Sequence, residues 1–208
     1  MFNKDLLNKF QELETPFYYY DIDVLNNNLD NLSKHLFGRG KVHYALKANS
    51  NVKLLNVIKS KGIGVDAVSS NEIKHALDVG FSPKDIVFAG VGKTDKEIEY
   101  SIKNNISYFN CESIEEIDVI NSISKNLNNI TQVSIRINPG IKTGTHKNIE
   151  TGYRNNKFGI DLNDINDLLD SFKTYSNLNL VGFHFHIGSQ IETTAPFLEL
   201  CKIGNQVN

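Results

Sequence analysis

Short apolar runs alternate with longer amphipathic stretches along most of the chain. The apolar runs occupy residues 42–46, 63–68, 86–91, 106–111, 133–137 and 178–186. Between them, apolar side chains recur at helical spacing. Strands that alternate with helices predict βαβ units and a parallel sheet buried on both faces.

The predicted helix starts support this pattern independently of the strands. Three times, a hydroxyl residue stands three positions before a glutamate, which is the spacing of a capping box. The pairs are Ser69 with Glu72, Thr94 with Glu97, and Ser113 with Glu116. Each pair follows one of three consecutive predicted strands, and Gly80, a few residues before Ile86, is placed to end the helix before the second of them.

The strand count points to an α/β fold of the TIM (β/α)8 type that is incomplete. About six of eight βα units are present, whereas a closed barrel needs about 250 residues. We expect this barrel over residues 23–208, with a helix at 24–37, after an N-terminal segment 1–22 that ends in an aromatic strand at 15–21. An open doubly wound sheet is the alternative. It usually carries a Gly-rich loop after its first strand, and here Leu46-Lys47-Ala48-Asn49 follows instead.

Composition narrows the class of protein. The net charge is -2 and there are three arginines, which leaves no basic stripe for a nucleic acid. No apolar stretch approaches the roughly 20 residues of a membrane span, and residues 1–14 do not resemble a secretory signal. Two cysteines make no disulfide framework, so we expect a cytoplasmic protein. Lysines among acids at 93–97 are interpreted as a solvated helix face.

Lys47, at the end of the first predicted strand, is the leading candidate for chemistry. An amine delivered into an apolar pocket loses solvation in its charged form, so its pKa falls and it can attack a carbonyl. The alternative interpretation is a surface lysine that caps a strand. Other polar residues stand at the ends of later strands, where barrel enzymes place their catalytic groups. They are Asp66, Ser69, Arg136, Asn138, His184, His186 and Ser189.

The two histidines alternate with phenylalanines, so both imidazoles are predicted on one side of the last strand. Three interpretations stand: an imidazole that packs against a planar ligand or moves a proton, a core histidine, or a metal pair that needs further ligands. Ser189 lies in a turn that suits an anionic phosphate. Arg136 is either an ion-pair partner of Asp66 or a ligand contact. His146, in the long polar loop 139–156, is a candidate substrate-side residue.

Five segments of the sequence resemble the alanine-racemase-fold, pyridoxal-phosphate-dependent decarboxylases, and among these the diaminopimelate decarboxylases. The segments are Tyr44-Ala45-Leu46-Lys47-Ala48-Asn49, Gly64-Val65-Asp66-Ala67-Val68-Ser69, Thr145-His146 with Ile149 and Thr151-Gly152, Asn156-Lys157-Phe158-Gly159, and His184-Phe185-His186-Ile187-Gly188-Ser189-Gln190. They run in the family's order from residue 15 onward. Phe185 stands where the family often has cysteine, and Asn148 where it often has an aromatic residue.

The resemblance implies a function and a role for each site residue. Lys47 would hold the aldehyde of pyridoxal 5'-phosphate, His186 would stack on its ring, and Ser189 would touch its phosphate. Asp66 and Arg136 would line the pocket. The activity implied is decarboxylation of meso-diaminopimelate to L-lysine by a homodimer. The family's Gly-rich phosphate loop and its C-terminal β-domain have no counterpart in these residues, so we expect an N-terminal portion with doubtful activity alone.

Three other functions remain open at this point. An amino-acid racemase, or an ornithine or arginine decarboxylase, would use the same fold and an early strand-borne lysine. A non-catalytic relative would bind the cofactor without releasing carbon dioxide. A metallohydrolase barrel would use the histidine pair as metal ligands.

Overall fold

The computed structural model describes residues 4–36, 38, 40–141 and 158–207. Packing divides the chain into two compact units, Met1–Gly40 and Lys41–Asn208. The division at residue 22 that the sequence pattern indicates stays a prediction. Within the described ranges, no helix is both long enough and apolar enough to cross a membrane.

The first unit contains helix α1 (Lys4–Gln11) and helix α2 (Ile22–Leu36). Helix α2 confirms the helix expected at 24–37, as far as that range is described. The aromatic strand expected at 15–21 is wrong, because these residues form no strand. Instead, the Phe10 ring contacts Phe17 and Tyr19, with centroids 5.3 and 5.1 Å apart. Aromatic residues favour strands only where a partner strand completes the ladder, and the described part of this unit has none.

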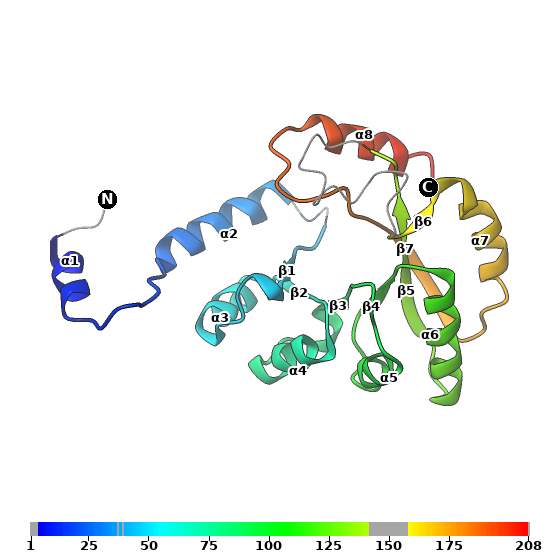
Figure 1. The fold of residues 1–208 in the computed structure, drawn as a ribbon, viewed down its shortest axis with the longest axis horizontal. Helices are drawn as coiled ribbons and strands as arrows, with labels where there is room; N and C mark the ends of the chain where they lie inside the picture. The colour runs from blue at the N-terminus through cyan, green and yellow to red at the C-terminus, as the bar shows by residue number, and fades with distance from the viewer. Residues whose placement is uncertain (1–3, 37, 39, 142–157, 208) are drawn as a thin grey trace. The chain divides into compact units, whose positions relative to one another are not determined.

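The second unit is built on a parallel sheet, which confirms the α/β class (Figure 1). Its strands are β1 (His43–Ala45), β2 (Gly64–Ala67), β3 (Ile86–Phe88), β4 (Tyr108–Cys111), β5 (Thr131–Asn138), β6 (Ile160–Asp161) and β7 (Leu178–Phe185). Strands β1 to β5 pair in chain order, and both β6 and β7 pair with β5. The six expected strands are confirmed. Strand β6 was missed because two residues are too few to give a pattern.

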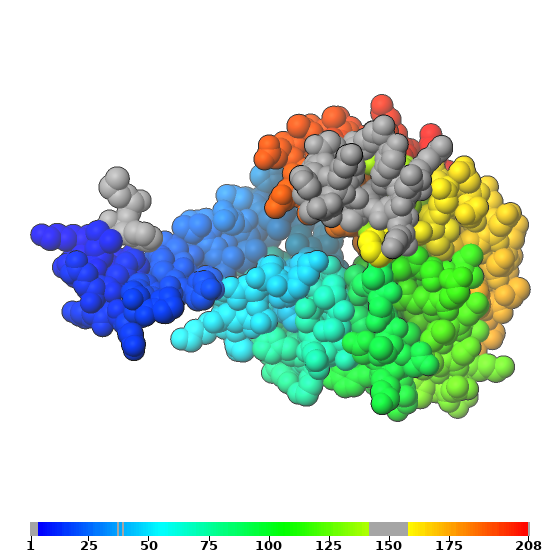
Figure 2. All heavy atoms as spheres, viewed as in Figure 1, coloured from blue at the N-terminus to red at the C-terminus, as the bar shows by residue number. Residues whose placement is uncertain are grey.

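Helices connect the strands, as the alternation predicts. They are α3 (Val52–Ser60), α4 (Ser70–Val79), α5 (Asp95–Lys103), α6 (Ile114–Asn126), α7 (Ile165–Phe172) and α8 (Ala195–Gly204), with short 3-10 turns at Leu46–Ala48, Pro83–Asp85 and Leu162–Asp164. Figure 1 shows α3 to α7 along the outer side of the curved sheet, and Figure 2 shows α3 to α6 as one continuous layer. Gly80 ends α4 in the left-handed conformation, at φ 88°.

The two faces of the sheet differ in character because side chains alternate along each strand. Under the helices, the strands bury apolar side chains such as Val65, Phe88 and Phe109 completely or nearly so. The opposite face carries polar residues that pair across strands. Asn110 is in register with Ser134, whose hydroxyl donates to the Asn110 side chain, and Arg136 is in register with His184. Asn110, Ser134, Arg136 and His184 therefore share one face of the sheet.

The three expected helix starts are confirmed, with a difference in detail. Thr94 and Glu97 form a reciprocal capping box. Ser69 and Ser113 also cap their helices, accepting from the third backbone N–H. Their glutamates, however, accept from the N–H one residue earlier, Glu72 from Val68 at 2.9 Å and Glu116 from Glu112 at 2.7 Å. These two carboxylates therefore tie each helix to the strand before it.

Lys93 is buried, which corrects the solvated helix face expected at 93–97. Its side chain is 1% exposed and its ammonium group donates to Gly90 O at 2.7 Å, Asn110 O at 2.8 Å and Glu116 Oε1 at 2.5 Å. All three N–H groups are thereby used. One buried cation thus joins the ends of β3 and β4 to the first turn of α6.

Replacing Lys93 by methionine will destabilise the fold strongly. The Lys93→Met variant leaves the Glu116 carboxylate uncompensated and two carbonyls without their donor, which costs about 3–5 kcal/mol for a buried pair. Lys103→Met is the matched control, because its partner Glu99 is also 2.5 Å away but both side chains are exposed. We expect a change within about 0.5 kcal/mol there. Urea denaturation measures both, and equal effects of the two variants would contradict the role of Lys93.

Candidate functional site

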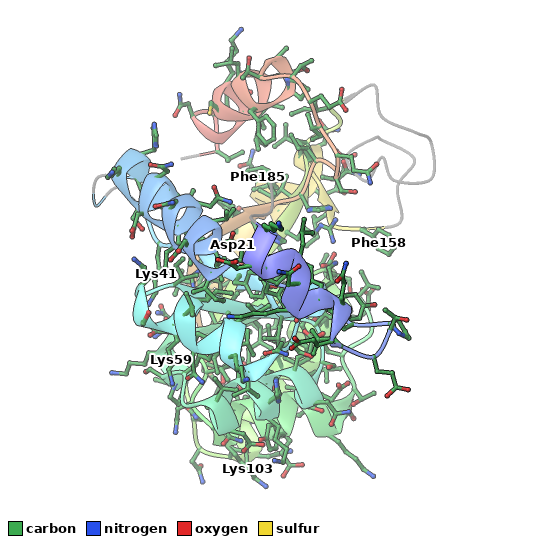
Figure 3. All side chains as sticks on the ribbon, turned by 90° about the vertical axis from the view of Figure 1, so that its left-hand side faces the viewer. Asp21, Lys41, Lys59, Lys103, Phe158 and Phe185 are labelled. Carbon is green, nitrogen blue, oxygen red and sulfur yellow. The ribbon has the colours of Figure 1, made fainter. Side chains whose placement is uncertain are left out.

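The strands β1 to β5 and β7 end at one edge of the sheet, which we call the carboxyl rim. In Figure 3, Phe158 and Phe185 lie toward this rim, while Lys103, in the last turn of α5, lies at the opposite end of the view. Among the described residues, the site residues predicted from the sequence lie within, or just after, an element that ends at this rim. The parallel sheet therefore brings the predicted site residues to one edge.

Lys47 lies in the 3-10 turn Leu46–Ala48, directly after β1. Leu46 is buried at 1% exposure and anchors the turn, whereas Lys47 is exposed. The apolar pocket expected around the amine is therefore wrong for the described residues. Lys47 is exposed because it lies beyond the end of β1, where the sheet no longer covers it. Only further chain segments or a ligand can cover a side chain at this position.

The charge of Lys47 acts on two other predicted site residues. Burial raises the pKa of Asp66 above its usual value, Glu72 adds to this, and the cations Lys47 and Lys93 oppose it. Burial mainly lowers the pKa of His186, and Arg136 and Lys47 lower it further. Since such effects fall off with distance, Lys47, Asp66 and His186 belong to one electrostatic neighbourhood.

Arg136 is paired with Glu112, and the pairing with Asp66 considered from the sequence is wrong. Its Nη1 donates to both carboxylate oxygens of Glu112, at 2.9 and 2.7 Å. The two side chains are 9% and 7% exposed, so both charges are largely removed from water. A buried pair with this geometry is stable because each charge compensates the other.

The Phe158-Gly159 segment covers Arg136 from one side. The guanidinium lies over the Phe158 ring, 5.6 Å from its centroid. Gly159 has φ 82°, and a Cβ there would lie 3.1 Å from Arg136 O and 3.2 Å from Asn138 N. Only glycine fits this approach without strain. The motif thus packs a ring against the buried cation at the point where β6 joins β5.

His184 and His186 differ in environment, although both follow the predicted spacing. His184 is in register with Arg136. Burial lowers the pKa of His184 to about 4, with further lowering by Arg136, His186 and Lys93. His186 follows the end of β7 and is more accessible, yet burial, Arg136 and Lys47 also lower its pKa. Both imidazoles are therefore biased toward the neutral form.

Ser189 lies in the turn that follows β7, as predicted. Ser189 is exposed, while Ile187 is buried and fixes the start of the turn. Gly188 has φ 135° and Gln190 has φ 57°, so two of the four turn residues are in the left-handed region. The hydroxyl is thus presented at the same rim as Lys47.

Two cavities flank these residues. One of about 410 Å³ is lined by residues of β4, β5 and β7, among them Tyr108, Ser134 and His184. The other, of about 420 Å³, lies at the starts of α5 and α6, and Lys93, Glu112, Glu116 and Phe158 line it. Glu112, the partner of Arg136, thus lines the cavity at the helix starts, while His184 lines the cavity on the polar face of the sheet.

Two predictions from the sequence, the role of His146 and the metal interpretation of the histidine pair, find no support in these contacts. His146, with its loop neighbours Thr143 to Arg154, lies outside the described residues. In the part of the chain that the structure describes, no group of three or more His, Cys, Asp or Glu side chains could hold a metal ion. The histidine pair therefore lacks, within those ranges, the further ligands that the metal interpretation needs.

Sequence reasoning missed Glu112 and Lys93. Glu112 directly follows β4, so the rule that selected the other strand-end residues would have found it. Lys93 gives no such signal, because it lies in a loop among other charges. Its burial depends on the carbonyls and the carboxylate that the fold collects around it.

The comparisons with known proteins agree with this geometry. Residues 24–204 match the family model described as pyridoxal-dependent decarboxylase, pyridoxal binding domain. The diaminopimelate decarboxylase of Bacteroides thetaiotaomicron is 45% identical over 203 residues, which are 97% of this chain and 53% of that protein. The chain therefore spans about half the length of the relatives it matches.

Solved structures confirm the partial barrel. The Helicobacter pylori diaminopimelate decarboxylase complexed with L-lysine superposes with a TM-score of 0.90 at 40% identity, over 99% of this chain and 53% of that one. The arginine decarboxylase of Paramecium bursaria Chlorella virus gives 0.75 at 26% identity, over 88% and 47%. On the family match and this likeness, the chain belongs to the pyridoxal-dependent decarboxylases and carries their pyridoxal binding domain.

Proposed function

We propose that this chain is the cofactor-binding part of a carboxy-lyase that converts meso-diaminopimelate to L-lysine, with pyridoxal phosphate held on Lys47. The observation that carries the proposal is that Lys47 directly follows β1, Asp66 lies on the paired strand β2 and His186 directly follows β7, all at the carboxyl rim. An amine, a carboxylate and an imidazole are the groups that a pyridoxal site requires around the aldehyde and the ring.

The residues present fit the cofactor. Two polar atoms of the described site, Asp66 Oδ1 and His184 Nδ1, are buried and have no hydrogen-bond partner there. Buried polar atoms of this kind are normally satisfied, so both are available to a ligand or to water. The exposed amine of Lys47 is accessible to an aldehyde, and the turn with Ser189 offers a hydroxyl at the same rim.

When bound, pyridoxal phosphate supplies an aldehyde that takes an amine and a ring that accepts the electron pair left when carbon dioxide departs. The chain's own residues supply binding and orientation. Lys47 provides the attaching amine, and His186 a neutral, planar surface for the ring. The carboxylate of Asp66 balances the Lys47 charge. Arg136, held by Glu112, keeps a fixed positive charge near both imidazoles.

The substrate is proposed from the relatives. Diaminopimelate decarboxylases of several bacteria match at 35–45% identity, and solved relatives carry L-lysine. An arginine-type decarboxylase is the second candidate, supported by the viral arginine decarboxylase at 26% identity. Product analysis of the complete gene product with meso-diaminopimelate, L-ornithine and L-arginine separates the two. We also propose a cytoplasmic homodimer, in which each site borrows groups from the partner.

Reductive labelling will place pyridoxal phosphate on Lys47. Adding the cofactor, reducing with borohydride and mapping peptides by mass spectrometry should find the pyridoxyl group on Lys47. Lys47→Ala should lose this label, whereas Lys53→Ala, which removes another exposed lysine six residues later, should keep it. A label carried mainly by any other lysine would contradict the site.

The fold will lose stability in acid through His184. The unfolded imidazole titrates near 6.5, and the folded one at about 4. Between these values the unfolded chain binds a proton that the folded chain does not, so stability falls as the pH falls. Between pH 6.5 and pH 4, the unaltered chain should lose about 2–3 kcal/mol more free energy of unfolding than the His184→Gln variant loses over the same range. Urea denaturation at several pH values measures both proteins. If their free energies of unfolding fall in parallel with pH, His184 is not the cause of the acid sensitivity.

A further inference from the structure

The connection that follows Lys47 is held by two side chains from different elements. The Tyr44 hydroxyl, on β1, donates to the carbonyl of Asn49 at 3.2 Å. His75 Nε2, on α4, lies 2.8 Å from the carbonyl of Ser50. A carbonyl oxygen only accepts, so this nitrogen carries a proton and donates. Two successive carbonyls, two and three residues after Lys47, are thus fixed from outside the turn.

These carbonyls belong to neither a strand nor a helix. The 3-10 turn ends at Ala48, and α3 starts at Val52 after its N-cap Asn51. Two local contacts order amides of this connection, since Asn49 Oδ1 accepts from Asn51 N at 3.0 Å and Asn51 Oδ1 from Lys53 N at 2.9 Å. Backbone carbonyls need a partner, and Tyr44 and His75 supply one to each of the two.

We propose that Tyr44 and His75 are positioning residues that fix the direction in which Lys47 leaves the rim. The inference rests on the proposed function of Lys47 as the residue that takes the aldehyde. Lys47 is exposed, so packing within the described residues does not orient its long side chain. A fixed backbone on both sides, with buried Leu46 before it and the two held carbonyls after it, reduces the conformations open to the amine.

Removing either donor should weaken cofactor capture without unfolding the chain. Tyr44→Phe and His75→Phe each delete one hydrogen bond and keep a ring of similar size. We expect each to lower the affinity for pyridoxal phosphate, followed by absorbance titration, by roughly three- to tenfold. His75→Gln keeps an N–H donor at the same reach and should restore most of the affinity. Lys74→Gln is the matched control on α4, since Lys74 contacts Asp78 and not the connection.

Two further measurements separate positioning from general damage. Hydrogen exchange of the amides at 47–51 should be faster in both phenylalanine variants, whereas their urea midpoints should stay close to that of Lys74→Gln. If the affinity for pyridoxal phosphate is unchanged in both phenylalanine variants and Lys47 is still labelled, the positioning role is overturned while the proposed function stands. A loss that merely follows the urea midpoint and is not rescued by His75→Gln would overturn it as well. If the unaltered chain is not labelled on Lys47, the proposed function itself fails.

Discussion

The charges buried at the carboxyl rim are stable because each is paired. Lys93 compensates Glu116, and Arg136 compensates Glu112, in side chains that are almost entirely removed from water. An isolated charge at these depths would be very costly. The pairs also join separate elements, since Lys93 bonds to carbonyls at the ends of β3 and β4, and Phe158, two residues before β6, covers Arg136. The rim is thus held by compensated charge as well as by the apolar layer under the helices.

The groups proposed for cofactor binding are polar side chains that take no part in these two ion pairs. Lys47 is exposed, and Asp66 and His184 each keep a buried polar atom without a partner in the described residues. The paired cations still act on His184, because Arg136 and Lys93 add to the lowering of its pKa that burial mainly causes. Structural ion pairs therefore set the electrostatic environment in which an amine, a carboxylate and an imidazole remain available to a ligand.

The fold could be predicted from the sequence because its elements carry strong local signals. Alternating apolar runs gave six of the strands, and hydroxyl–glutamate pairs gave three helix starts. The aromatic run at 15–21 failed because a strand depends on a partner, which local sequence does not reveal. In the site, strand ends predicted where Lys47, Asp66 and Arg136 lie. They did not predict that Arg136 pairs with Glu112 or that Lys93 is buried, since both depend on contacts between distant segments.

A crystal structure of the chain after reduction with pyridoxal phosphate and borohydride tests the central claim most directly. The account predicts a pyridoxyl group on Lys47 that lies against His186, with Arg136 still bound to both oxygens of Glu112. It would be contradicted if Arg136 left Glu112 to bind the phosphate, because the guanidinium would then be a ligand contact and not half of a compensated pair.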